Sequence, residues 1–131
     1  MRLVHLLAAA GLSTLLGQVA GAQEIHPART VQTLYEACQH DDAIFIMRCK
    51  AYLAGVADAL HFLAVYQQAH ATELRNAGLT VAPFAICHDE AWNPEMLRSL
   101  VVAWAERHPE RRQDDQYAGA MQALTVAWPC R

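Results

Sequence analysis

The chain has 131 residues, and its 10 basic side chains stand against 13 acidic ones, which gives a formal net charge of −3. This length is sufficient for one domain with a modest core but not for two domains of ordinary size. The acidic balance argues against a nucleic-acid-binding protein, because such proteins neutralise phosphates with clustered Lys and Arg.

The amino terminus has the features of a secretory signal. Arg2 precedes an apolar run over residues 3–16, and small residues in an A-x-A pattern end at Ala22. This pattern predicts a signal peptide over residues 1–22, which leaves 23–131 as a single domain. The apolar run is shorter than the about 20 residues that span a bilayer, so we expect no stable membrane anchor after cleavage. An uncleaved anchor is the alternative.

Four cysteines follow the signal, namely Cys38, Cys49, Cys87 and Cys130. In an exported chain, an even number of cysteines indicates disulfide bonds. A catalytic thiol or a zinc site is the alternative, but the chain has no C-x-x-C pair and its spacings match no common metal pattern. We therefore expect structural disulfides.

The first two helices are predicted from apolar periodicity and a capping signal. Val31, Leu34 and Cys38 lie on one helical face, which predicts a helix over about residues 27–39. Either aspartate of the following sequence HDD can accept hydrogen bonds from the first backbone N–H groups of a helix. A second helix is therefore expected to begin directly after these aspartates.

The second predicted helix is unusually apolar and extends to about Ala69. Ionised side chains within it, such as Arg48 and Asp58, would be costly at a bilayer centre, so we interpret it as a buried central helix. Gly55 costs about 1 kcal/mol relative to Ala in a helix interior, which suggests a close packing partner there. A tolerated glycine is the alternative. The apolar surface of this helix exceeds what one small core needs, which suggests a homodimer.

The second half of the chain predicts two more helices. Residues 75–90 show no sustained period and are expected to form a connection with a short strand or turn. Asn93 and Pro94 supply the N-cap and the first residue of a helix that ends near His108. One aspartate of the sequence QDDQ caps the last helix, which Pro129 stops. Four helices without a convincing strand pair indicate an all-α bundle.

The order of the helices favours one pairing of the cysteines, although sequence alone allows three. If the first two helices are antiparallel, Cys38 and Cys49 come close to each other. The last two helices bring Cys87 and Cys130 together by the same argument. We therefore expect these two pairs, which makes the fold a small disulfide-stapled bundle.

Two groups of polar residues are candidates for chemistry. Asp58 and His61 are three residues apart on a predicted helix and could form an acid–base pair, although a local polar contact is the more ordinary outcome. His88, Asp89 and Glu90 could attract a cation, but sequence neighbours rarely supply a whole coordination sphere. The chain contains no G-x-S-x-G, phosphate-loop or H-E-x-x-H motif. We therefore expect a protein that is not an enzyme and has no cofactor or metal.

Three segments together resemble the Rap/Tai family of type VI secretion immunity proteins. They are CKAYLAGVADAL (residues 49–60), HPE (108–110) and AWPC (127–130). The residues that match the family motifs are Cys49, Tyr52, Leu53, Gly55 and Val56 in the second helix, and Pro129 with Cys130 at the carboxyl end. The sequence CHDE departs from the family pattern, because a proline is expected shortly after Cys87.

The resemblance implies a periplasmic protein that binds a peptidoglycan amidase effector and occludes its active site. The motif positions are chiefly structural, so the contact surface is sought in the loops. We rank the turn before the last helix first and the connection over residues 75–90 second. The residues of this turn are Glu110, Arg111, Arg112, Gln113, Asp114 and Asp115. The alternatives are a general periplasmic helical binding or stress protein without a cognate toxin and, more remotely, a small enzyme that uses Asp58 and His61.

Overall fold

The computed structural model describes residues 29–79, 84–88 and 91–130. The helices are α1 (Val31–Gln39), α2 (Ala43–Ala69), α3 (Ala71–Asn76), α4 (Pro94–Arg107) and α5 (Gln116–Ala127), with one turn of 3-10 helix, η1 (Pro109–Arg111). Within the described residues, extended pairing is limited to isolated bridges. The predicted all-α fold is therefore confirmed. The predicted signal peptide over residues 1–22 lies outside the described residues, as do Asp89 and Glu90.

The helix starts follow the capping signals of the sequence. The carboxylate of Asp42 accepts a hydrogen bond from the backbone N–H of Ile44 (2.7 Å). The side chain of Asn93 caps α4, and that of Asp115 caps α5, each by accepting two backbone N–H groups. The side chain of Thr30 accepts a hydrogen bond from the third residue of α1, which places the start of this helix at Val31.

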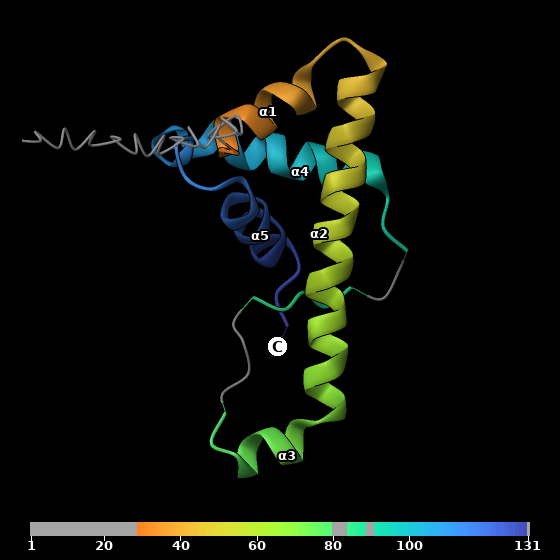
Figure 1. The fold of residues 1–131 in the computed structure, drawn as a ribbon, viewed down its shortest axis with the longest axis vertical. Helices are drawn as coiled ribbons and strands as arrows, with labels where there is room; N and C mark the ends of the chain where they lie inside the picture. Colours follow the sequence, from red (N-terminus) through yellow and green to blue (C-terminus); the bar gives the residue numbers. More distant parts are fainter. Residues whose placement is uncertain (1–28, 80–83, 89–90, 131) are drawn as a thin grey trace, which may run out of the picture.

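The bundle is built along one side of α2. In Figure 1, α1, α4 and α5 lie beside the first part of α2, whereas its carboxyl-terminal part continues past them and carries α3. The short helix α3 was not predicted, because His70 ends α2 without a Gly or Pro signal. Gly78, with φ of 68°, follows α3 in a backbone conformation that glycine adopts readily. None of the helices in the described parts of the chain is long and apolar enough to cross a membrane.

The core lies between α1, α2, α4 and α5. Its largest fully buried side chains are Leu53, Leu60, Ile86, Leu97, Leu124, Val31, Val101, Cys38 and Cys49. Most come from the four helices, while Ile86 comes from the connection before α4. The core therefore depends on this connection as well as on helix packing.

The close approach of two helices occurs at Gly119 rather than at Gly55. A Cβ atom at Gly119 would lie 2.3 Å from Cγ2 of Val31, so α5 can pack against the start of α1 only without a side chain there. A Cβ atom at Gly55 would have no atom within 4 Å, and this residue is exposed. The prediction of a close packing partner for Gly55 is therefore wrong within the single chain, because this glycine faces away from the bundle.

Candidate interaction surfaces

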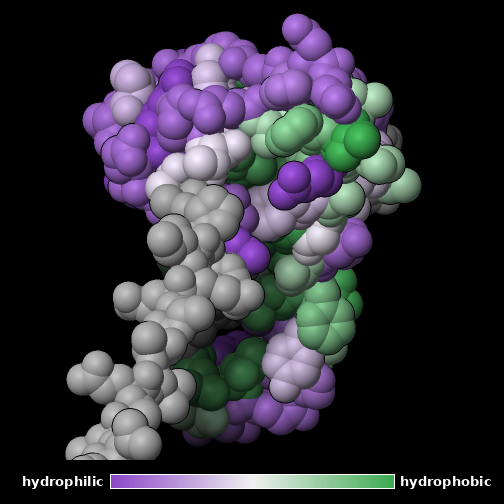
Figure 2. Space-filling model, turned by 45° about the horizontal axis from the view of Figure 1, so that its top comes forward, coloured by the Kyte–Doolittle hydropathy of each residue, from purple (hydrophilic) through white to green (hydrophobic). Residues whose placement is uncertain are grey.

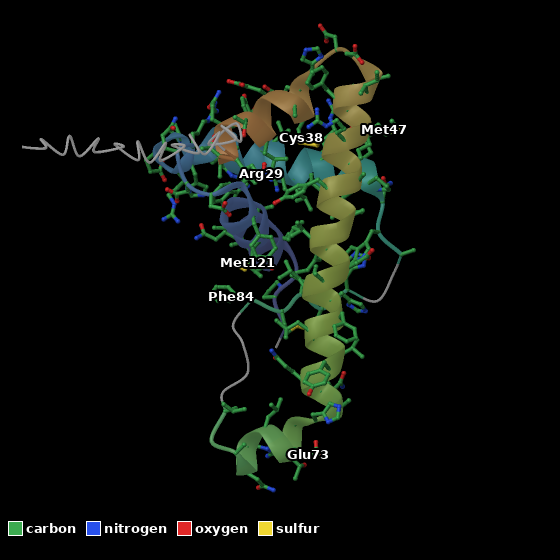
Figure 3. The ribbon with its side chains drawn as sticks, viewed as in Figure 1. Arg29, Cys38, Met47, Glu73, Phe84 and Met121 are labelled. Atoms are coloured by element: carbon green, nitrogen blue, oxygen red, sulfur yellow. A yellow bond between two sulfur atoms is a disulfide. The ribbon has the colours of Figure 1, made fainter. Side chains whose placement is uncertain are left out.

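The two disulfides have the pairing that the helix order favours. Cys38 bonds to Cys49 and Cys87 bonds to Cys130. Cys38 lies between α1 and α2 (Figure 3). The first disulfide fastens α1 to α2, and the second fastens the end of the chain to the connection before α4. Two disulfides fit an oxidising compartment.

The turn between α4 and α5 is attached to the start of α1. The backbone N–H of Val31 donates to the carbonyl of Asp114 (2.9 Å), and that of Gln32 donates to the carbonyl of Arg112 (2.8 Å). The N–H of Gln116 in turn donates to the carbonyl of Arg29 (2.9 Å). These bonds hold the turn in one conformation against a neighbouring helix, so its exposed side chains project from a rigid support.

Arg112, one of the six predicted contact residues, points into the bundle. Its guanidinium carbon lies 3.9 Å from the ring centroid of Tyr35. The same group donates hydrogen bonds to the carbonyl of Ala105 (3.2 Å) and to the side chain of Gln32 (3.1 Å). A cation in contact with an aromatic face and two acceptors is held firmly. The structure therefore gives Arg112 a role in joining α1, α4 and the turn.

The other residues of the turn divide into paired and outward-facing groups. Arg111 forms an ion pair with Asp114 (2.5 Å), while Asp115 caps α5. Glu110 and Gln113 are exposed. The pKa of Glu110 lies below its usual value. The main cause is a hydrogen bond from the backbone N–H of Glu110 itself, and the contact with His108 lowers the pKa further. Glu110 is therefore a charged carboxylate at neutral pH, available to a basic partner.

A recess lies beside this turn, between η1, the end of α4 and α5. Its volume is about 320 Å³, and its lining includes Trp104, His108, Glu110 and Arg111. Val126 of α5 also lines it and is 73% exposed. The turn thus combines a charged rim with an apolar wall, an arrangement that can receive a side chain of a bound protein.

The family-motif residues of α2 differ in their environments. Leu53 and Val56 belong to the core. Tyr52 is partly buried, and its pKa is raised by burial first and then by the nearby charge of Asp115. Gly55 is exposed. At the chain end, Pro129 pairs with Ile86 in an isolated bridge, so most of the motif has a structural function.

The outer face of α2 carries exposed apolar side chains at both ends. Met47 lies at the right-hand edge of α2 in Figure 3 and is 63% exposed. The large apolar residues exposed on this helix are Ile44, Phe45, Met47, Phe62, Val65 and Tyr66. Apolar surface runs along the right-hand side of Figure 2, the side on which α2 lies in Figure 1. An open groove of about 540 Å³ beside the first part of α2 has a lining that includes Ala51, Ala54 and Pro94.

The candidates for chemistry are not assembled into a site in the described parts of the chain. Asp58 is exposed, whereas the ring of His61 packs edge-on against Trp92 at 5.8 Å. The ring of His88 lies 4.8 Å from Trp92 and 4.7 Å from Trp128. No group of three metal-ligating side chains occurs among the described residues. These histidines therefore lie in aromatic packing.

The structure thus defines a small disulfide-bonded helical domain that presents a rigid charged turn and an exposed apolar helix face, surfaces of the kind that bind other proteins. Residues 30–130 match the family model of the Rap1a immunity proteins, and the chain belongs to this family. The match confirms the resemblance found in the sequence motifs. No curated protein and no solved structure matches the chain significantly.

Proposed function

We propose that the protein is a periplasmic immunity protein that binds a type VI secreted peptidoglycan amidase and occludes its active site. Membership of the Rap1a immunity family is the observation that carries this proposal. The predicted signal peptide over residues 1–22 and the two disulfides support export to an oxidising compartment. The mature domain would then comprise residues 23–131. Its mechanism would be steric, without catalysis or cofactor.

The exposed side chains of the α4–α5 turn are the proposed contacts with the amidase. Glu110 and Gln113 face solvent, and hydrogen bonds to α1 hold the turn beneath them. A rigid turn loses little conformational entropy when it enters a cleft. The net charge of −3 would also favour the encounter with a basic effector. Arg112 and Asp115 would contribute indirectly, because they hold the turn.

Replacing both Glu110 and Gln113 by alanine is expected to weaken amidase binding at least tenfold without changing the thermal midpoint. Binding would be measured by calorimetry with the amidase encoded beside this protein. The matched control is Glu73→Ala with Gln68→Ala, since both residues are exposed and Glu73 contacts His70 as Glu110 contacts His108. Wild-type affinity in the Glu110 and Gln113 variant would place the contact elsewhere.

Protection of cells separates this proposal from that of a general periplasmic binding or stress protein. Co-expression of the full chain should restore growth of cells that export the neighbouring amidase, whereas a chain that begins at residue 23 should not. Failure of the exported protein to neutralise any hydrolase encoded nearby would favour the general binding protein. Full protection by Asp58→Ala and His61→Ala variants is expected, because no chemistry is assigned to these residues.

We further propose that two copies associate through the outer face of α2. Small exposed residues, Ala51, Gly55 and Ala59, occupy the middle of this face, and the large apolar side chains lie on either side. This distribution is nearly symmetric about Gly55. In an antiparallel pair centred on Gly55, Ile44 of each copy would lie opposite Tyr66 of the other, and the two glycines would let the backbones approach closely.

Phe62→Lys is expected to weaken this self-association at least tenfold, because position 62 of one copy lies opposite Arg48 of the other in this pair, where a second cation replaces an apolar ring. Sedimentation of the wild-type chain should give the mass of a dimer at micromolar concentration, and the variant should shift toward the monomer. Val126→Lys is the control, since Val126 is similarly exposed but lies on α5. A monomeric wild-type protein, or equal shifts in both variants, would contradict the α2 interface.

A further inference from the structure

The two disulfides differ in their access to solvent. Cys38 and Cys49 are 0% and 1% exposed, whereas Cys87 and Cys130 are both exposed. Thiol–disulfide exchange requires a thiolate to reach one sulfur of the bond that it breaks. A reductant in solution therefore has access to Cys87–Cys130 in the folded protein but reaches Cys38–Cys49 only after the core opens.

The exposed disulfide holds two segments together at the edge of the bundle. The backbone N–H of Cys87 donates to the carbonyl of Trp128 (3.1 Å), and Ile86 forms an isolated bridge with Pro129. The N–H of Ile86 also donates to the carbonyl of Leu60, at a longer 3.4 Å. The first two contacts attach the chain end to the connection before α4, whereas burial of Ala85 and Ile86 anchors that connection in the core. The disulfide closes the longer of the two covalent loops, with a sequence separation of 43.

We propose that Cys87–Cys130 is a thiol–disulfide exchange site for dithiols and that its reduction releases the chain end, residues 129–130, from Cys87 while the bundle stays folded. A thiolate of the dithiol bonds to one protein sulfur and breaks the Cys87–Cys130 bond. The second thiolate then displaces that protein sulfur. Two electrons pass to the protein, both cysteines become thiols, and the dithiol becomes a disulfide. The two protons lost by the dithiol end on the cysteines.

The other contacts that hold the helices together remain after Cys87–Cys130 is reduced. Cys38–Cys49 still joins α1 to α2. The turn before α5 still donates and accepts its hydrogen bonds with α1. Apart from Ile86, the buried cluster that forms the core comes from α1, α2, α4 and α5. Ile86 stays in this core, so the released segment is the chain end and neither the connection nor the scaffold of the proposed contact turn.

Limited reduction of the full mature chain tests this proposal. Oxidised protein is treated with dilute dithiothreitol, quenched with iodoacetamide and digested for peptide mass spectrometry. Alkylation at Cys87 and Cys130 should be at least tenfold faster than at Cys38 and Cys49. The same reaction in denaturant is the control, and there the difference should largely disappear. Equal rates in the native protein would overturn the proposal.

Hydrogen exchange of the selectively reduced protein tests the extent of the release. The backbone amide of Cys87 should exchange at least tenfold faster than in the oxidised protein, while amides in α4 and α5 keep their protection. A Cys87→Ser, Cys130→Ser variant should show the same pattern without reductant. Loss of protection throughout the helices, or no change at Cys87, would contradict the proposed release. Because no amidase is present, these outcomes are independent of the proposed function.

Discussion

Replacing both Cys38 and Cys49 by alanine is expected to lower the free energy of unfolding by about 3 kcal/mol, on the chain-entropy model for a short loop. The disulfide closes a sequence separation of 11 and is buried between α1 and α2. Small domains have total stabilities of about 5–15 kcal/mol, so this loss is a large fraction. Urea denaturation followed by circular dichroism measures it.

The double alanine variant avoids an unpaired thiol that would form mixed disulfides. Its comparison is Ala37→Ser, a single small change on α1 beside Cys38 that leaves the disulfide intact. That variant should differ from the wild-type chain by less than about 1 kcal/mol. A double variant with wild-type stability would mean that packing alone holds α1 on α2.

Gly119→Ala is expected to destabilise the protein by about 1–2 kcal/mol, whereas Gly55→Ala should stabilise it by up to about 1 kcal/mol. The new methyl group at Gly119 would overlap Cγ2 of Val31, a buried and stiff side chain, and the packing loss exceeds the gain in helix propensity. At Gly55 the methyl group meets open space, so the propensity gain remains.

Thermal and urea unfolding of these two variants at low protein concentration provides the measurement, because dilution keeps self-association from contributing. The two substitutions are chemically identical and both lie within helices. A change of the same sign at both positions would therefore contradict the packing difference between α5 and the outer face of α2.

Local signals in the sequence were sufficient for most helix boundaries. The sequence HDD predicts Asp41 or Asp42 as a cap, and the structure uses Asp42; Asn93 caps α4 as predicted. The pairing of Cys38 with Cys49 followed from the order of the helices. Helix α3 was not predicted, because the break between α2 and α3 is a change of backbone conformation at His70, and no Gly or Pro marks this position in the sequence.

Long-range contacts were less accessible to sequence reasoning. Gly55 and Gly119 look alike in a helical pattern, and only the packing of α5 on α1 distinguishes them. The proposed contact turn was located by its charge, but the inward position of Arg112 depends on Tyr35, which is distant in sequence. A pattern of charges predicts the position of a turn, but it does not predict which side chains of the turn point inward and pack against other helices.

The hydrogen bond between Arg29 and the start of α5 holds the first described residue of the chain beside the proposed contact turn. The carbonyl of Arg29 accepts the N–H of Gln116, the first residue of α5. Under the proposed cleavage after Ala22, only a few residues would join a fusion at residue 23 to Arg29, so the fused protein would be tethered close to the turn that we propose as the amidase contact. Fusions intended to report on partner binding consequently belong at neither this end nor the disulfide-bonded carboxyl end, and an exposed site on α3 is the better attachment point.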